Sequence, residues 1–379
     1  MALVLNEEQN MLKDAAAGFL AEKATVAHQR ALRDSGDAQG FDSAVWQEMA
    51  QMGWAGIAID EEFGGLGYGY TGLGLVLEQM GRHLSASPLQ STVLIGATVI
   101  AQLATQAQKE QWLPSIAAGE QLVSLALQEG AHHALWDVTL SAQKSGDTYL
   151  LNGSKRMVLD CSSASAFIVV ARTAGAAGDE AGLSAFIVAA DTPGLVCEQR
   201  SLVDSRNVGV ITLTDVVVDA QHLLGSEGEA AQGLGRALDI ANIGLSAELL
   251  GLSVEAFTRT IDYLKERKQF GRVIGSFQGL QHRAAELFAE LELCRSLVLQ
   301  SLQAIDSAAD DLPMRASATK AKLCQIAQIT TNEAIQMHGG IGMTDEHEIG
   351  FFIKRARVAQ HTLGDYNYHL DRYALLGGF

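Results

Sequence analysis

Two stretches of this chain carry most of the information about its fold: Arg267-Lys-Gln-Phe-Gly271, which continues to Ser276-Phe277-Gln278, and Gln336-Met-His-Gly-Gly-Ile-Gly342. Each follows a long segment with apolar residues at helical spacing, so each is expected at the end of a helix. Taken singly, an arginine at a helix end is usually a solvated charge stabilised by the helix dipole, and a Gly-Gly pair is usually a turn. Their meaning therefore depends on the segments around them.

The apolar pattern divides the chain into three predicted domains, 1–118, 119–226 and 227–379. The first has the helical period, with Asn6 as the predicted N-cap of its first helix. In the second the period changes to two, and segments such as 166–172 predict strands separated by Gly, Asp and Ser turns. The third returns to helical spacing over several long segments. The predicted fold class is α+β, mainly α, with an N-terminal helical domain, a middle β-barrel or sandwich, and a C-terminal four-helix bundle.

Composition excludes several classes of function. The net charge of -17 argues against nucleic acid as a partner, because nucleic-acid binders concentrate Lys and Arg. No run approaches the roughly 18–20 uninterrupted apolar residues that span a bilayer, and the N-terminus lacks the layout of a signal peptide. The four cysteines form no CxxC, so neither a zinc site nor a disulfide framework is predicted, and His132-His133 has no further ligands spaced for a metal. We expect a cytoplasmic protein that binds no metal.

Helices, then strands, then a helical bundle is the order of the acyl-CoA dehydrogenase family, which the chain resembles over essentially its whole length. The likeness runs from Asn6-Glu-Glu-Gln9 through Glu62-Phe-Gly-Gly65 to the last helix. The C-terminal stretches Arg267-Lys-Gln-Phe-Gly271, Gly275-Ser-Phe-Gln278 and Leu363-Gly-Asp365 look most like the small partner subunit of heteromeric enzymes such as pimeloyl-CoA dehydrogenase.

The resemblance implies a flavoprotein oxidoreductase of fatty acid or sterol side-chain degradation. Such enzymes remove a proton alpha to an acyl-CoA thioester and pass a hydride from the beta carbon to FAD. An arginine supplies paired donors for a pyrophosphate, and glycines let a backbone approach a dinucleotide closely. By motif match, the expected FAD contacts are Arg267, Phe270, Gln278, Gln336, Gly339 and Gly340. In the family these groups reach across a subunit interface, so a tetramer and an electron-accepting flavoprotein partner are also implied.

The catalytic carboxylate of the family is missing from both of its usual positions. Counted from Gln336, the first position holds Leu363, and the second, on the first long bundle helix, holds Ala241. The nearest carboxylates are Asp365, Asp239 and Glu248. Glu248 lies seven residues after Ala241, about 10 Å further along the helix, which exceeds the reach of a general base. Asp365 and Glu248 remain weak candidates for that role.

The middle part also departs from the family pattern. A serine that contacts flavin in the family is replaced by Ala134, and a Trp-Ile-Thr segment is replaced by Met157-Val158-Leu159. The sequence therefore favours a base-lacking partner subunit that pairs with a larger acyl-CoA dehydrogenase chain. Two alternatives stay open: a homotetrameric dehydrogenase with a displaced base, and a non-catalytic acyl-CoA-binding relative.

Overall fold

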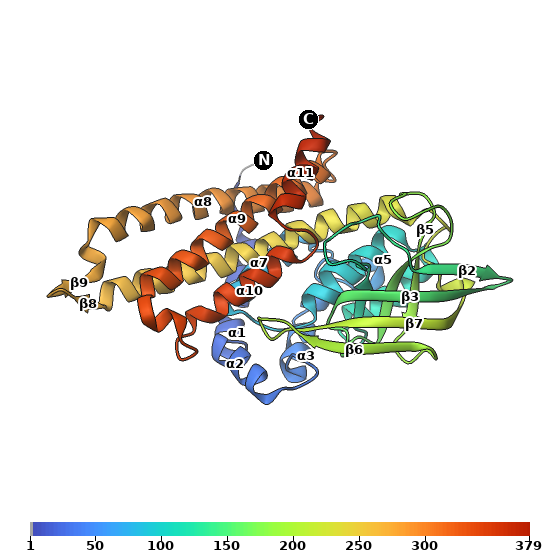
Figure 1. The fold of residues 1–379 in the computed structure, drawn as a ribbon, viewed down its shortest axis with the longest axis horizontal. Coiled ribbons are helices and arrows are strands. Elements are labelled where there is room, and N and C mark those ends of the chain that lie inside the picture. Colours follow the sequence, from blue (N-terminus) through green and yellow to red (C-terminus); the bar gives the residue numbers. More distant parts are fainter. Residues whose placement is uncertain (1–2) are drawn as a thin grey trace. The chain divides into compact units, whose positions relative to one another are not determined.

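The computed structural model describes residues 3–379, which fold into two compact units. Unit 1 contains residues up to 31, residues 70–86 and residues 242–379, and unit 2 contains residues 32–69 and 87–241. The long helix α7 (Ala230–Glu266) begins in unit 2 and continues in unit 1. Figure 1 shows the order of the elements along the chain. The division into three domains at 118 and 226 stays a prediction.

Unit 1 is helical. Its elements are α1 (Glu7–Lys23), the start of α2 (Val26–Ser35), α4 (Gly69–His83), the second part of α7, the hairpin strands β8 (Lys268–Gln269) and β9 (Arg272–Val273), α8 (Gln278–Asp306), α9 (Leu312–His338), α10 (Ile349–His361) and α11 (Tyr366–Leu376). α9 packs against α8, α10 and α11, and the hairpin joins the ends of α7 and α8 (Figure 1). The predicted N-cap is confirmed, because the Asn6 side chain accepts from the Gln9 N–H in a capping box.

α4 and α7 cross at two glycines. A Cβ atom at Gly81 would lie 2.1 Å from the carbonyl oxygen of Glu248, and one at Gly251 would lie 1.8 Å from that of Glu78. The absence of side chains at these two positions allows the helix backbones to touch. α7 has an 18-residue window with mean hydropathy 1.4, apolar and long enough to cross a membrane, but the whole window is buried in the protein. α7 is thus a core helix.

Unit 2 combines helices with one sheet. Its helical elements are α3 (Ser43–Gln51), the short turns η1 (Trp54–Gly56) and η2 (Glu61–Phe63), the π-helical segment η3 (Leu89–Ala97), α5 (Thr98–Leu103) and α6 (Gln106–Ala117). The strands are β1 (Val123–Ala126), β2 (Ser141–Ser145), β3 (Thr148–Leu159), β4 (Ala166–Arg172), β5 (Leu183–Ala189), β6 (Leu195–Ser201) and β7 (Asn207–Asp219). They form a seven-stranded sheet in the order β1-β4-β2-β3-β7-β6, with β5 paired to β4.

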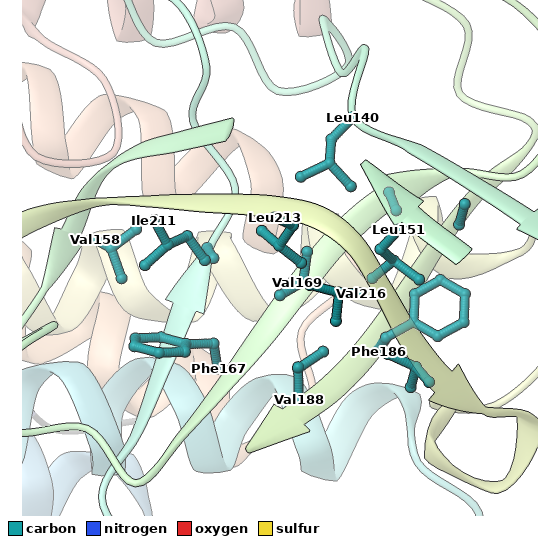
Figure 2. Packing of buried hydrophobic residues seen from close by; sticks show 14 of the residues in the cluster. Leu140, Leu151, Val158, Phe167, Val169, Phe186, Val188, Ile211, Leu213 and Val216 are labelled. Carbon is teal, nitrogen blue, oxygen red and sulfur yellow. The ribbon is translucent and has the colours of Figure 1, made fainter. Parts of the chain in front are cut away.

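The core of unit 2 lies against this sheet. Two strand pairs supply a shared apolar cluster, which Figure 2 shows. The β4–β5 pair contributes Phe167, Val169, Phe186 and Val188, and the β3–β7 pair contributes Val158, Ile211 and Leu213. Each of these side chains is at most 2% exposed. Because alternate residues of a strand point to the same face, one apolar set per strand is enough to build the cluster. The predicted fold class is confirmed, with the middle part formed as one curled sheet.

The sequence predicted no disulfide framework, but among the described residues the structure has one disulfide bond. Cys161, in the turn after β3, is bonded to Cys197 on β6. Cys294 and Cys324 are free and buried. The two bonded residues are 36 positions apart, and the sequence alone does not show that β6 lies beside this turn.

Candidate functional site

The first motif forms a hairpin at the end of α7. Phe270 and Gly271 make its two-residue turn with φ angles of 53° and 75°, which is the pattern of a type I′ turn. Phe270 is 91% exposed. Arg267 is exposed too, and within residues 3–379 its guanidinium makes no hydrogen bond or ion pair. Gln278, the first residue of α8, is exposed as well. The hairpin thus offers an unpaired cation, an amide and an aromatic ring to a binding partner.

The second motif closes α9. Gln336 is exposed in the last turn, and Gly339 ends the helix with a φ of 67°, a value that favours glycine. A Cβ atom at Gly339 or Gly340 would meet no other atom within 4 Å. The space beside this backbone is therefore open on the side where a side chain would stand.

Tyr263, which sequence reasoning missed, links the two motifs. Its carbonyl accepts the Arg267 N–H at 2.9 Å, and its hydroxyl donates to the His338 carbonyl at 3.3 Å. Its ring also stacks on that of His338, with centroids 4.4 Å apart. The structure thus brings the start of the hairpin and the end of α9 together through one residue. The sequence did hold one signal for Tyr263: it lies four residues before Arg267, so the two residues are neighbours on one face of the helix.

The position expected for a catalytic glutamate lies in the loop between α10 and α11. Leu363 occupies it with a φ of 57°, which is unusual for a leucine. The fully buried Lys320 ammonium donates to the carbonyls of Thr362 at 2.6 Å and Gly364 at 3.0 Å, and the His369 ring donates to the Leu363 carbonyl at 3.0 Å. Burial lowers the pKa of Lys320. The loop is therefore firmly held, but its central side chain is an alkyl group that takes no proton.

The other candidate bases have structural roles. Glu248 is 4% exposed, and its two oxygens accept from Nε and a terminal nitrogen of Arg355, both at 2.8 Å. Asp365 caps α11 by accepting the Tyr368 N–H at 3.0 Å. Ala241 is fully buried in α7. Paired in these ways, the carboxylates are poorly suited to abstract a proton.

In unit 2, a buried lysine links the two segments expected near a flavin ring, which are the one that leads to Ala134 and the one that contains Met157–Leu159. Lys155, on β3, donates to the Leu127 carbonyl at 3.0 Å and to the Glu129 carboxylate at 2.6 Å. Burial lowers the pKa of Lys155 to about 8, with Glu129 acting against it. Burial tends to raise the pKa of Glu129, but Lys155 and hydrogen bonds from Thr139 and Leu140 outweigh it and lower that pKa. These contacts fix the backbone of both segments.

The positions that the family fills with polar or aromatic flavin contacts, Ala134 and Met157–Leu159, carry only apolar side chains here. Met157 has a φ of 54° and is 39% exposed, whereas Val158 is buried. Ala134 is exposed in a loop, as is His132. An unpaired arginine and an open Gly-Gly backbone fit the pyrophosphate half of FAD, while the ring half is offered mainly backbone and apolar groups.

Comparison with known proteins shows three family domains in succession along the chain. The family models of the N-terminal, middle and C-terminal domains of acyl-CoA dehydrogenase match residues 6–120, 127–216 and 232–374. The chain is 31% identical to the probable acyl-CoA dehydrogenase YngJ of Bacillus subtilis, over 95% of each chain. The chain belongs to the acyl-CoA dehydrogenase family.

Two further comparisons extend this result. A mitochondrial short/branched chain specific acyl-CoA dehydrogenase of Bos taurus is 30% identical, over 97% of this chain and 85% of that protein. The ChsE4-ChsE5 complex of Mycobacterium tuberculosis contains a chain that is 25% identical, with a TM-score of 0.89 and coverage of 100% and 99%. Members of the family are FAD-dependent flavoprotein oxidoreductases, so the predicted cofactor is confirmed at the level of the family.

Proposed function

We propose that this chain is a base-lacking partner subunit of a heteromeric acyl-CoA dehydrogenase. The observation that carries the proposal is Leu363 in a loop that is otherwise fully ordered by Lys320 and His369. Ala241 at the second position leaves no carboxylate there either. In the assembly, a larger dehydrogenase chain supplies the glutamate that removes the alpha proton of the acyl-CoA.

The contribution of this chain is to bind the dinucleotide. Arg267 provides a planar, permanently charged fork for the pyrophosphate, and the Gly339–Gly340 backbone lets that group approach closely. Gln278, Gln336 and Phe270 complete the surface offered to the adenosine side. FAD held by these residues would supply the hydride acceptor for the beta carbon, and an electron-accepting flavoprotein would take up its electrons. We place the assembly in the cytoplasm, as a tetramer with the three domains 1–118, 119–226 and 227–379.

The exposed dinucleotide motif supports an oligomer, because within residues 3–379 the Arg267 guanidinium makes no hydrogen bond or ion pair, as expected for a group that serves a neighbouring subunit. One observation favours a heteromer over a homotetramer. A two-component complex is among the structures that this chain resembles. The homotetramer with a displaced base has weaker support, because Glu248 is paired with Arg355 and Asp365 caps a helix. The acyl-CoA-binding relative without catalysis is the remaining alternative.

Co-expression tests the proposal. The chain is purified alone and together with the larger acyl-CoA dehydrogenase encoded beside it, and each product is sized and its visible flavin absorbance measured. We expect little or no flavin in the lone chain and a yellow, active heteromer from the pair. Full FAD occupancy with turnover by the lone chain would overturn the proposal and favour the homotetramer. Removing the larger chain's glutamate should abolish activity of the pair.

Arg267→Ala tests the dinucleotide contact in whichever assembly binds FAD. Loss of one charge-assisted bidentate contact should weaken FAD retention by about 10- to 100-fold, and Arg267→Lys should recover only part. Arg272→Ala is the matched control, because Arg272 lies on the same hairpin but stacks over the Phe277 ring at 4.3 Å. Equal retention by the Arg267→Ala and Arg272→Ala variants would show that the motif assignment is wrong.

A further inference from the structure

The Cys161–Cys197 disulfide joins two segments on either side of β7. β7 pairs with β3 and with the edge strand β6, and Gly209 lies opposite Val158 on one side and Gln199 on the other. A Cβ atom at Gly209 would be 2.0 Å from the Cys161 sulfur. Glycine at this position therefore leaves the room through which the bridge passes over β7.

The two sulfurs have different surroundings. Cys161 is 2% exposed and belongs to the apolar core of unit 2, where it packs with Val158, Ala164 and Ile211. Cys197 lies on β6, which is exposed from Val196 onward. A thiolate attacks a disulfide at the sulfur that it can reach. The exposed Cys197 is therefore the point of attack, and Cys161 is the sulfur expelled.

The turn that carries Cys161 has other anchors. The side-chain amide of Asn207 donates to the hydroxyls of Ser162 at 2.6 Å and Ser163 at 3.1 Å, and the main-chain carbonyl of Asn207 accepts the Asp160 N–H at 3.0 Å. The Ser163 hydroxyl also donates to the Gln39 carbonyl at 2.8 Å. β6 stays paired with β7 along its whole length. Opening the disulfide thus leaves the sheet and the turn in place, so the bond is able to open and reform in the folded protein.

We propose that Cys161–Cys197 is a thiol–disulfide exchange site for a dithiol reductant, with Cys197 as the attacked sulfur. The first reductant thiolate bonds to the Cys197 sulfur, the bridge breaks, and its electron pair goes to Cys161, which takes up a proton. The second reductant thiol then attacks the mixed disulfide, closes the reductant disulfide and releases Cys197. The reductant loses two electrons and the cysteine pair gains them. In a reducing compartment such bonds are usually transient and report redox state.

Exchange changes the mobility of a defined region. The disulfide restrains β6, an edge strand of the sheet, and the backbone around Met157 and Asp160, whose φ angles are 54° and 49°. Once it opens, this region loses its only covalent tie within the described residues apart from the chain itself. We expect amide exchange there to become about tenfold faster or more, while the rest of the sheet is unchanged.

Thiol mapping tests the chemistry. The folded full-length chain is equilibrated in dithiothreitol redox buffers, quenched with acid, unfolded, alkylated and mapped by mass spectrometry. We expect Cys161 and Cys197 to change state together. Cys294 and Cys324 are free cysteines and serve as internal controls, which should be alkylated to the same extent in every buffer. In a separate reaction the disulfide is opened with glutathione and the mixed disulfide is trapped by alkylation. The glutathione adduct should map to Cys197. Failure to form the bond in oxidising buffer, opening only with unfolding, or an adduct mainly on Cys161 would each overturn the proposal.

Hydrogen–deuterium exchange tests the consequence. The oxidised and reduced proteins are compared with Cys197→Ser, which lacks the bridge and changes only an exposed position. The reduced protein and Cys197→Ser should show the same faster exchange in β6 and residues 157–161, and adding dithiol should not alter the variant. If the oxidised and reduced proteins exchange identically in this region, the bridge controls nothing and the proposal fails. Neither measurement depends on bound flavin, so both are independent of the proposed function.

Discussion

At the scale of single residues, buried charges fix the loops that the sequence singled out. Lys320 has no exposed surface, yet its ammonium is satisfied by backbone carbonyls on either side of Leu363. Glu248 and Arg355 form a similarly buried pair. A buried charge is tolerated only when partners replace its water, so removal of either partner is costly.

Lys320→Met should destabilise unit 1. The variant keeps the length of the side chain but leaves carbonyls of the loop without a donor, and each unsatisfied buried group costs about 1–3 kcal/mol. We therefore expect the free energy of unfolding, measured by urea titration, to fall by at least about 2 kcal/mol. Lys322→Met is the control, because Lys322 lies on the same helix and pairs with Glu290 near the surface. Equal effects of the two substitutions would contradict this role of Lys320.

Glu248→Gln should act on stability because it removes the carboxylate that accepts two hydrogen bonds from the buried Arg355. The expected loss in unfolding free energy is about 3–5 kcal/mol. Glu292→Gln, which breaks a pair with Arg295 at the surface, should cost at most about 1 kcal/mol. The double variant Glu248→Leu/Arg355→Met should recover much of the loss. If Glu248→Gln is as stable as the parent but abolishes dehydrogenation by the lone chain, Glu248 is a base after all.

At the scale of elements, the sequence predicted what long patterns specify. The Asn6 cap and the two motifs expected at helix ends are local signals. α1 begins just after Asn6, α7 ends just before Arg267, and α9 ends within Gln336–Gly342. β1 has only four residues, and β6 is almost wholly exposed and has no apolar face, so neither was predicted. A strand of this kind is specified by its neighbour β7 and not by its own sequence.

Gly251→Ala tests the crossing of α4 and α7. The added methyl would lie 1.8 Å from the Glu78 carbonyl oxygen, so the helices must separate, at a cost of about 1–3 kcal/mol in unfolding free energy. Gly18→Ala in α1 is the opposite case, because no atom lies within 4 Å of its added Cβ. That change should stabilise the protein by about 0.5–1 kcal/mol. A drop in the thermal midpoint for Gly18→Ala, or a rise for Gly251→Ala, would refute this account.

At the scale of the whole molecule, the fold follows from the sequence, while the contacts that support the candidate dinucleotide site do not. Arg267, Gln336 and Gly339 were singled out because their motifs are local, and their contact with FAD stays a prediction. Lys320 and Tyr263 were missed because, in sequence, each is an ordinary residue of a long helix. Their roles depend on which carbonyls and rings the tertiary fold places beside them, and no spacing rule encodes that.

The buried Lys155 makes global stability depend on pH. Its pKa is about 8 in the folded protein, below the unfolded value of about 10.4, so between these values the unfolded state binds more protons. Stability from this group therefore rises with pH across that window, by up to about 3 kcal/mol, and is constant below it. The difference in unfolding free energy between the parent and Lys155→Met, measured from pH 7 to 10.5, should grow in favour of the parent. A flat difference would contradict the lowered pKa.

The loop around Leu363 also bears on how such a chain could arise. Its path is set by main-chain carbonyls held by Lys320 and His369, and by the Asp365 cap, none of which involves the side chain at position 363. Exchanging a carboxylate for an alkyl group there would leave these main-chain contacts in place. For the proposed partner subunit, such an exchange in one copy after a gene duplication would remove the catalytic residue and keep the contacts that hold the loop.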